Sequence, residues 1–330
     1  MRTVLLASVL VAVVLALWIA AWAITSMPGK SHRGPLPPFD VAERDLAGRL
    51  RAHVTAIASE EHNVAHPAAL ERSVRYLESV LGREGIEVAR QEFDAGGVKV
   101  RNLEIVIGRA PTPAQKLVVV GAHYDSARGA VGANDNGTGA AAVLELARAL
   151  KGFRPAAGVE LRLVLFVNEE LPWFGTQAMG SLVHADALAK ESKQVLAMLS
   201  LETIGYYSDA PGSQRYPKPF SALYPSEGNF IGFVGNWRSR DLVRRCVESF
   251  RAHAAFPSEG GTFPDVVRDA GRSDHWAYWR HGWPALMVTD TAPFRYPHYH
   301  TLADTPDKID YERMARVVRG IEAVVRELAS

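Results

Sequence analysis

The 330-residue sequence has a single cysteine, Cys246, and almost no net charge. One cysteine excludes an internal disulfide framework. It falls in the helical pattern RDLVRRCVESF, so we expect a buried thiol rather than a nucleophile. A net charge of +1 lacks the basic excess typical of nucleic-acid binding, so we expect no nucleic-acid partner. With 48% apolar and 22% charged residues, the composition is that of a globular protein with a substantial core.

Charged residues are also absent from Thr3 to Thr25. A helix of this length can span a hydrocarbon layer of about 30 Å. The apolar core of a cleaved signal peptide is usually shorter, about 7–15 residues. The run therefore favours an uncleaved anchor, although AWA at 21–23 could serve as a cleavage site. We expect residues 1–26 to be a transmembrane anchor or a signal segment. The folded domain would then lie outside the cytoplasm, membrane-anchored or secreted.

A Pro/Gly-rich linker, 27–39, precedes a single domain at 40–330, in which strand-like runs alternate with helical periodicity. The expected strands are 85–93, 100–108, 116–125, 160–170, 195–205, 229–236 and 284–290. The expected helices are 41–59, 66–84, 138–150, 173–184, 239–253 and 307–328. This alternation predicts an α/β fold with a mostly parallel central sheet flanked by helices.

Polar side chains follow three of these strands, in the motifs AHYD, NEE and LET. A fourth polar cluster, RYPHYHTLADT, follows the last strand after several residues. In open α/β sheets, ligands bind beyond the carboxyl ends of the strands. We therefore expect these clusters to meet at one edge of the sheet and to form the functional site.

The individual motifs allow more than one interpretation. His123 and Asp125 are two residues apart on an extended backbone, so the carboxylate could orient the imidazole for a metal. Asp135, in GANDNGTG, could be part of a tight turn or a ligand. Adjacent carboxylates at Glu169 and Glu170 repel each other unless a cation offsets their charge. Glu202 closes an apolar strand, where a buried carboxylate needs a partner.

Together the motifs supply a complete set of nitrogen and oxygen ligands for metal ions. His298 and His300 are two residues apart, and one of them could bind metal while the other lines the rim. The candidate ligands are His123, Asp135, Glu170, Glu202 and His300. Five such ligands without a thiolate suit two zinc ions that share a carboxylate. Water between the ions would be the nucleophile, and Glu169 would move its proton.

In order, GAHYDS, GANDNGTG, NEE, LETIG and YHTLADT resemble the motifs of the co-catalytic di-zinc aminopeptidases, metallopeptidase family twenty-eight, whose relatives include glutaminyl cyclases. The resemblance covers about 115–310. It implies a zinc aminopeptidase-like, phosphorylase/hydrolase-like α/β/α sandwich. It also implies that His123 and Glu202 hold one zinc, that Glu170 and His300 hold the other, and that Asp135 bridges them. Asp125 would orient His123.

The implied reaction is hydrolysis of a peptide with a free N-terminus, with Glu169 as general base and then acid. Many members of the family have aspartate where this chain has Glu202. Tyr206, Tyr207 and His298 are candidate substrate-binding residues. A glutaminyl cyclase-like acyltransferase with one zinc is the alternative, and a non-catalytic binding domain on the same scaffold is a third interpretation.

Overall fold

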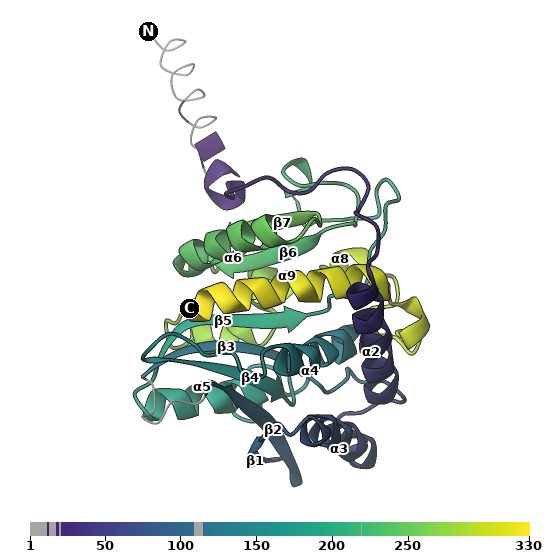
Figure 1. The fold of residues 1–330 in the computed structure, drawn as a ribbon, viewed down its shortest axis with the longest axis vertical. Coiled ribbons are helices and arrows are strands. Elements are labelled where there is room, and N and C mark those ends of the chain that lie inside the picture. The colour runs from purple at the N-terminus through teal and green to yellow at the C-terminus, as the bar shows by residue number, and fades with distance from the viewer. Residues whose placement is uncertain (1–11, 13–17, 20, 109–114, 219) are drawn as a thin grey trace, which may run out of the picture.

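The computed structural model describes residues 12, 18–19, 21–108, 115–218 and 220–330, and its centre is one eight-stranded sheet (Figure 1). The strand order is β1-β2-β4-β3-β5-β8-β6-β7. The strands are β1 (Ala89–Ala95), β2 (Val98–Ile107), β3 (Lys116–His123), β4 (Val159–Phe166), β5 (Gln194–Glu202), β6 (Ile231–Asn236), β7 (Ser258–Phe263) and β8 (Ala285–Thr289).

The four central strands, β4, β3, β5 and β8, run parallel to one another. The hairpin β1–β2 joins them antiparallel at one side. On the other side, β6 pairs antiparallel with β8 and parallel with β7. In β3, Leu117 and Val119 face one layer, whereas Val118 and Val120 face the other, and all four are buried. Strands covered on both faces need such continuous apolar runs.

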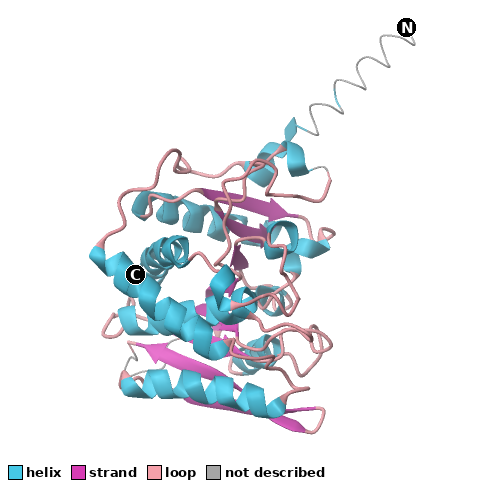
Figure 2. Cartoon of the chain, turned by 90° about the vertical axis from the view of Figure 1, so that its right-hand side faces the viewer, coloured by secondary structure: helices cyan, strands magenta, loops and turns pink. Residues whose placement is uncertain are grey.

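Helices cover both faces of the sheet (Figure 1, Figure 2). One face packs against α2 (Val41–Ile57), α3 (Pro67–Arg83), α4 (Gly139–Ala149), α6 (Arg240–His253) and α9 (Tyr311–Ala329). The other face packs against α5 (Gly180–Lys190) and α7 (His275–Trp279). A short α8 (Ala292–Arg295) follows β8. The three layers confirm the predicted α/β class, and the sheet is mixed, with a parallel centre.

Most expected elements are present, but several differ from the prediction, and the short helices α7 and α8 are not among the expected helices. The sequence predicts no strand at β7, because SEGGTF contains two glycines and little apolar alternation. The helix expected at 173–184 begins only at Gly180, after a series of turns. The final helix begins at Tyr311 rather than at residue 307. Asp310 caps this start, because its side chain accepts a hydrogen bond from the Arg313 backbone N–H.

The expected anchor or signal segment lies mostly outside the described residues. Among the residues that are described, no helix combines the length and the apolar character needed to cross a membrane.

Residues 27–39 have no regular helix or strand, yet they contact the domain. The Arg251 guanidinium donates to the carbonyls of Pro28 and Gly29, and the Ser258 backbone N–H donates to Ser31 Oγ. This segment therefore lies along α6 and β7.

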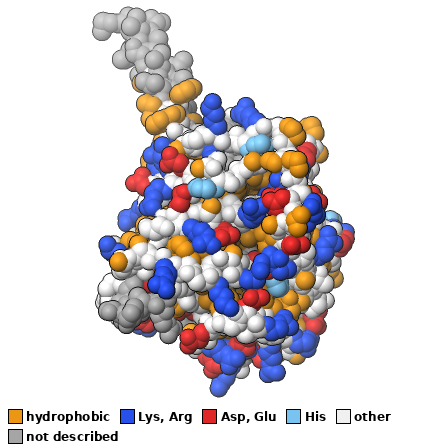
Figure 3. All heavy atoms as spheres, viewed as in Figure 1, with side chains coloured by type: hydrophobic (Ala, Val, Ile, Leu, Met, Phe, Trp, Pro, Cys, Tyr) orange, Lys and Arg blue, Asp and Glu red, His pale blue; other side chains and the backbone are white. Residues whose placement is uncertain are grey.

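On the face shown in Figure 3, basic and acidic side chains are interspersed.

Candidate metal centre

The polar motifs converge at the edge formed by the carboxyl ends of the central strands. His123 is the last residue of β3, and Glu202 is the last residue of β5. Glu169 and Glu170 follow the end of β4 by a few residues. Because these strands are parallel, their ends meet at one edge of the sheet.

An irregular turn, 133–138, carries Asp135 to this edge. Gly132 begins the turn with φ of 78°, a conformation that favours glycine. At Gly139, where α4 begins, a Cβ atom would lie 2.3 Å from the Leu201 carbonyl oxygen. The turn can therefore pack directly against the end of β5, which brings Asp135 beside His123.

The two histidines divide the carboxylates into two groups that share Asp135. His123 Nε2 lies 3.3 Å from Asp135 Oδ1 and 3.3 Å from Glu202 Oε2. His300 Nε2 lies 2.9 Å from Asp135 Oδ2 and 3.1 Å from Glu170 Oε1. Each oxygen of Asp135 thus faces a different imidazole.

The donor atoms of this cluster fit a cation better than they fit one another. His123 Nε2, both Asp135 oxygens and Glu170 Oε1 are buried, yet none makes a well-formed hydrogen bond within the described chain. Ligand atoms of these three residues all lie within 4.8 Å of one another. Buried polar atoms normally have partners. Their shared orientation is the arrangement expected of metal ligands, and oxygen and imidazole donors suit zinc.

Crowding and burial raise the pKa of several carboxyls. Burial, together with the neighbouring Glu202 and Glu170 carboxylates, holds the pKa of Glu169 well above its usual range. Burial and the Asp135 carboxylate raise the pKa of Glu170 to about 7. The pKa of Glu202 is raised, chiefly by burial. A metal cation would favour the ionised carboxylates and oppose these shifts.

The pKa values of the two histidines are also raised, although burial acts on them in the opposite sense. Burial alone would lower the pKa of His300, but the Asp135 and Glu170 carboxylates raise it to about 10. Burial likewise opposes ionisation of His123, and Glu202, Asp125 and Asp135 raise its pKa well above the usual value. Without a cation, the site therefore balances its negative charge with protons on the histidines.

Asp125 connects His123 to the loop that carries Glu169 and Glu170. Its side-chain oxygens accept the backbone N–H groups of Glu169 and Glu170, at 3.2 and 3.3 Å. His123 Nδ1 lies 3.0 Å from the Asp125 main-chain oxygen and 3.5 Å from its Oδ1. The imidazole therefore turns Nε2, rather than Nδ1, toward the cluster.

Two further aspartates hold the Asp135 turn in place. The Asp304 carboxylate accepts the backbone N–H groups of Asn134 and Asp135, at 2.8 and 3.1 Å. Asp290 accepts from the Asn134 side-chain amide and from the Gly205 backbone. Neither aspartate is assigned a role from the sequence, although both lie in polar stretches after β8.

Glu202 is held by side chains outside the predicted ligand set. The Ser273 hydroxyl donates to Glu202 Oε2 at 2.7 Å, and Ser200 Oγ lies 2.9 Å from Ser273 Oγ. The Asn136 side-chain amide also approaches Oε2, at 3.4 Å. One orientation of the glutamate is therefore favoured.

The three residues predicted to bind substrate lie outside the cluster. The Tyr207 side chain is buried, and its hydroxyl donates to the Ile204 carbonyl. The Tyr206 ring packs against Tyr296 at 4.8 Å, and the His298 ring meets the same tyrosine edge-on at 5.4 Å. None of these three side chains lines the pocket described below.

Tyr299 lies beside the cluster and is not among the residues predicted from the sequence. Its ring stacks on His300 with a centroid distance of 3.8 Å, and it lines the adjoining pocket. No hydrogen bond of its hydroxyl is found among the described residues. Burial and the Asp135 and Glu170 carboxylates hold its pKa above the usual range, so the hydroxyl keeps its proton. Its position between two histidines in YPHYH was the only sequence signal.

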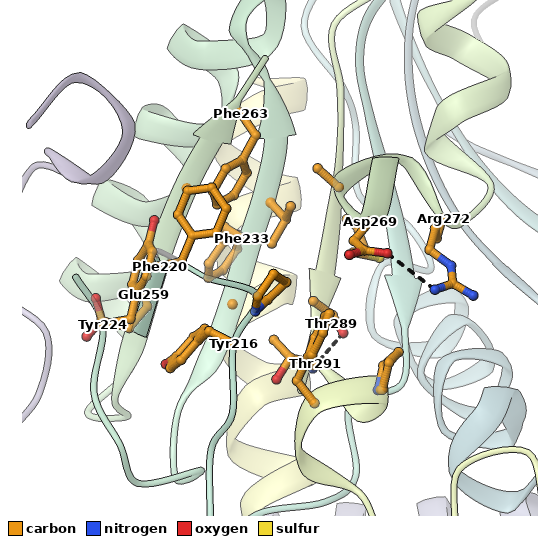
Figure 4. A pocket seen from close by; sticks show the side chains of 18 of the residues that line it. Tyr216, Phe220, Tyr224, Phe233, Glu259, Phe263, Asp269, Arg272, Thr289 and Thr291 are labelled. Carbon is orange, nitrogen blue, oxygen red and sulfur yellow. Dashed lines mark hydrogen bonds and ion pairs between the residues drawn. The ribbon is translucent and has the colours of Figure 1, made fainter. Parts of the chain in front are cut away.

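A largely apolar pocket adjoins the cluster at Glu202 and Tyr299 (Figure 4). It encloses about 130 Å³, near the size of a cavity that holds a benzene molecule. Aromatic side chains from the segment 206–229 and from β6 and β7 form much of its wall. The cluster of candidate ligands therefore opens, beside Glu202, toward a space suited to one amino-acid side chain.

The model of peptidase family M28 matches residues 105–325. An uncharacterized protein, YfbL of Escherichia coli K12, is 39% identical over 261 residues, which cover 76% of this chain and 78% of YfbL. A probable leucine aminopeptidase of Arthroderma otae is 27% identical over 288 residues, covering 79% of this chain and 70% of the relative.

Solved structures share the fold. The LapA aminopeptidase of Legionella pneumophila superposes with a TM-score of 0.69 at 20% identity, over 92% of this chain and 80% of LapA. A glutaminyl cyclase of Fimbriiglobus ruber gives a TM-score of 0.60 at 21% identity, over 91% and 98% of the two chains. At these identities the structures establish the fold alone.

Proposed function

Because this chain belongs to peptidase family M28, we propose that it is a zinc-dependent aminopeptidase that cleaves the bond after the N-terminal residue of a peptide. The observation that carries the proposal is that each oxygen of Asp135 faces a different histidine. A carboxylate placed in this way suits a bridge between two metal ions. The similarity to a probable leucine aminopeptidase supports the same reaction class.

We assign the ligands to two zinc sites according to these contacts. His123 and Glu202 would hold one ion, Glu170 and His300 would hold the other, and Asp135 would contribute one oxygen to each. Bound zinc supplies Lewis acidity, which makes water a nucleophile near neutral pH and polarises a carbonyl group.

Glu169 is the proposed general base and acid. Its Oε2 lies 3.8 Å from His123 Nε2, so it borders the cluster without belonging to either histidine's closest contacts. Its carboxylate would accept a proton from the attacking water and return it to the leaving amine. The hydrogen bonds from the Glu169 and Glu170 N–H groups to Asp125 position this loop, so Asp125 acts through its neighbours.

Tyr299 is our candidate for stabilising the oxyanion. It stacks on His300, lines the pocket and has a protonated hydroxyl. A donor there would strengthen its hydrogen bond as negative charge develops on the carbonyl oxygen.

We also propose that the catalytic domain works outside the cytoplasm. The support comes from the uncharged run Thr3–Thr25. Within the described part of this run, Trp18, Ile19 and Trp22 expose much of their apolar side chains, as expected of a segment that is covered elsewhere. Fractionation of cells, followed by N-terminal sequencing of the isolated protein, distinguishes an anchored chain from a cleaved one.

The proposed activity is tested with leucyl-p-nitroanilide, its N-acetylated analogue and a glutaminyl peptide. An aminopeptidase hydrolyses the free-amine substrate, spares the acetylated one, loses activity on chelation and regains it with zinc. Cyclisation of the glutaminyl peptide without hydrolysis would instead establish the cyclase alternative. No turnover of any substrate by zinc-loaded protein would favour a binding domain.

A further inference from the structure

A glutamate without a partner lies in the wall of the apolar pocket, away from the metal cluster. Glu259 lines the pocket and is partly buried, and no hydrogen bond or ion pair of its carboxylate is found among the described residues. Figure 4 shows Glu259 beside Tyr224, Tyr216 and Phe220, on the side opposite Asp269 and Arg272. A carboxylate in such surroundings has lost hydration and gained no counter-ion.

Strand pairing places this glutamate on the same face of the sheet as the metal ligand Glu202. Glu202 pairs with Thr289, Thr289 with Gly232, and Gly232 with Glu259, in one row across β5, β8, β6 and β7. Directly paired residues point to the same face. Gly232 has no side chain, so the floor between the two glutamates is open at that position.

The length of this row fits one long side chain. Neighbouring strands lie about 4.8 Å apart, so three steps separate the two glutamate backbones by about 14 Å. A lysyl residue spans about 7–8 Å from its carbonyl carbon to Nζ when extended. A polar contact of about 3 Å at each end brings the total to about 14 Å.

The walls around Glu259 are aromatic. Tyr216 and Tyr224 stack with a centroid distance of 5.6 Å, and Phe220 meets Phe263 edge-on at 5.1 Å. Both tyrosine hydroxyls are already engaged, because they donate to the carbonyls of Pro225 and Gly260. The rings therefore offer their π surfaces to a ligand, and such surfaces attract cations.

The nearest cations of the protein do not neutralise this carboxylate. Burial raises the pKa of Glu259, and Arg251 and Arg33 only partly oppose that shift. The Arg251 guanidinium instead donates to Ser258 and to the 28–29 carbonyls. At the opposite wall, Arg272 pairs with Asp269 at 3.3 Å. Among the described residues, Glu259 therefore has no counter-ion in direct contact at this end of the pocket.

We propose that Glu259 and the surrounding aromatic rings receive the cationic side chain of an N-terminal lysine or arginine. The inference rests on the proposed aminopeptidase function and names its preferred substrates. An apolar stem would lie along the aromatic wall, and the ammonium or guanidinium group would meet the Glu259 carboxylate. A neutral side chain of equal length would leave that carboxylate unpaired.

The test compares substrates that differ only in this charge. Lysyl- and norleucyl-p-nitroanilide form one matched pair, and arginyl- and citrullyl-p-nitroanilide form the other. The full-length wild-type protein should show kcat/KM at least about tenfold higher for each charged substrate. Glu259→Gln should remove most of this preference, mainly through KM, while norleucyl turnover stays within about twofold of wild type.

Glu227→Gln is the control, because Glu227 lies on the same loop as Tyr224 but does not line the pocket. It should keep the wild-type preference. Norleucyl hydrolysis without a lysyl preference, or an unchanged preference in Glu259→Gln, would overturn this inference and leave the proposed function standing. Absence of hydrolysis of all four substrates would overturn both.

Discussion

The Ser273 hydroxyl donates a hydrogen bond of 2.7 Å to Glu202 Oε2, the same oxygen that lies 3.3 Å from His123. A glutamate side chain has one more methylene than an aspartate side chain, so its carboxylate could adopt more orientations. Ser273 and Asn136 restrict that freedom. The longer side chain is thus compatible with a defined ligand position.

Replacing Ser273 by alanine should weaken the zinc site that contains Glu202. Loss of a hydrogen bond that orients a ligand typically costs 10- to 100-fold in metal affinity. Competition with a chromophoric chelator should show one of two zinc ions binding more weakly, with kcat recovering at high zinc concentration. Ser200→Ala is the matched control, since Ser200 Oγ lies 2.9 Å from Ser273 Oγ and, within the described part of the chain, no hydrogen bond joins it to Glu202. Equal zinc affinities in wild type and Ser273→Ala would exclude the positioning role.

Glu169→Gln should retain zinc but lose most of its activity. The amide keeps the size of the side chain and cannot accept the proton of water, and general-base catalysis typically contributes 10²- to 10⁴-fold. Steady-state kinetics and metal analysis on the same preparation test this. Glu191→Gln, at an exposed position after α5, should remain fully active. Wild-type kcat in Glu169→Gln would show that another group moves the proton.

Tyr299→Phe should reduce kcat by roughly 10²-fold and leave KM nearly unchanged, because a hydrogen bond to the oxyanion forms fully only in the transition state. The phenylalanine ring can still stack on His300, so zinc content should not change. Tyr207→Phe removes a hydroxyl that donates to Ile204 and should cost stability rather than catalysis. A larger kcat effect at Tyr207 than at Tyr299 would contradict this assignment.

Zinc binding should release protons near neutral pH. The pKa of His300 is raised to about 10 and that of Glu170 to about 7 without metal, so the first group is protonated and the second partly so. Metal binding requires both to be deprotonated, and zinc affinity should therefore fall as the pH falls. Calorimetry in buffers with different ionisation enthalpies should report release of at least about one proton per chain. No dependence of the binding enthalpy on the buffer would contradict the charge balance described above.

The positions of the candidate ligands at the strand ends were predictable, because local sequence patterns place them there. The apolar runs before His123, Glu169 and Glu202 define buried parallel strands, and such strands bring their polar ends to one edge. The position of His300 could not be predicted from a strand pattern. It lies in a loop with φ of 55°, which only the tertiary structure stabilises.

The supporting contacts depend on tertiary structure and could not be derived from local patterns. Asp304 reaches the backbone of Asp135, and Ser273 reaches Glu202, across long stretches of chain. The β7 strand was missed because its two glycines obscure the alternation of side chains, and Glu259 was missed with it. Its backbone pairing with β6, rather than the pattern of its own residues, defines this segment as a strand.

Anomalous scattering of the zinc-loaded full-length protein, measured across the zinc absorption edge, tests the proposed two-zinc site most directly. We expect two peaks about 3.5–4 Å apart, one on each side of Asp135. One peak should lie between His123 and Glu202, and the other should lie between Glu170 and His300. A single peak, with the second histidine left unligated, would contradict the bridging role of Asp135 and the two-zinc mechanism.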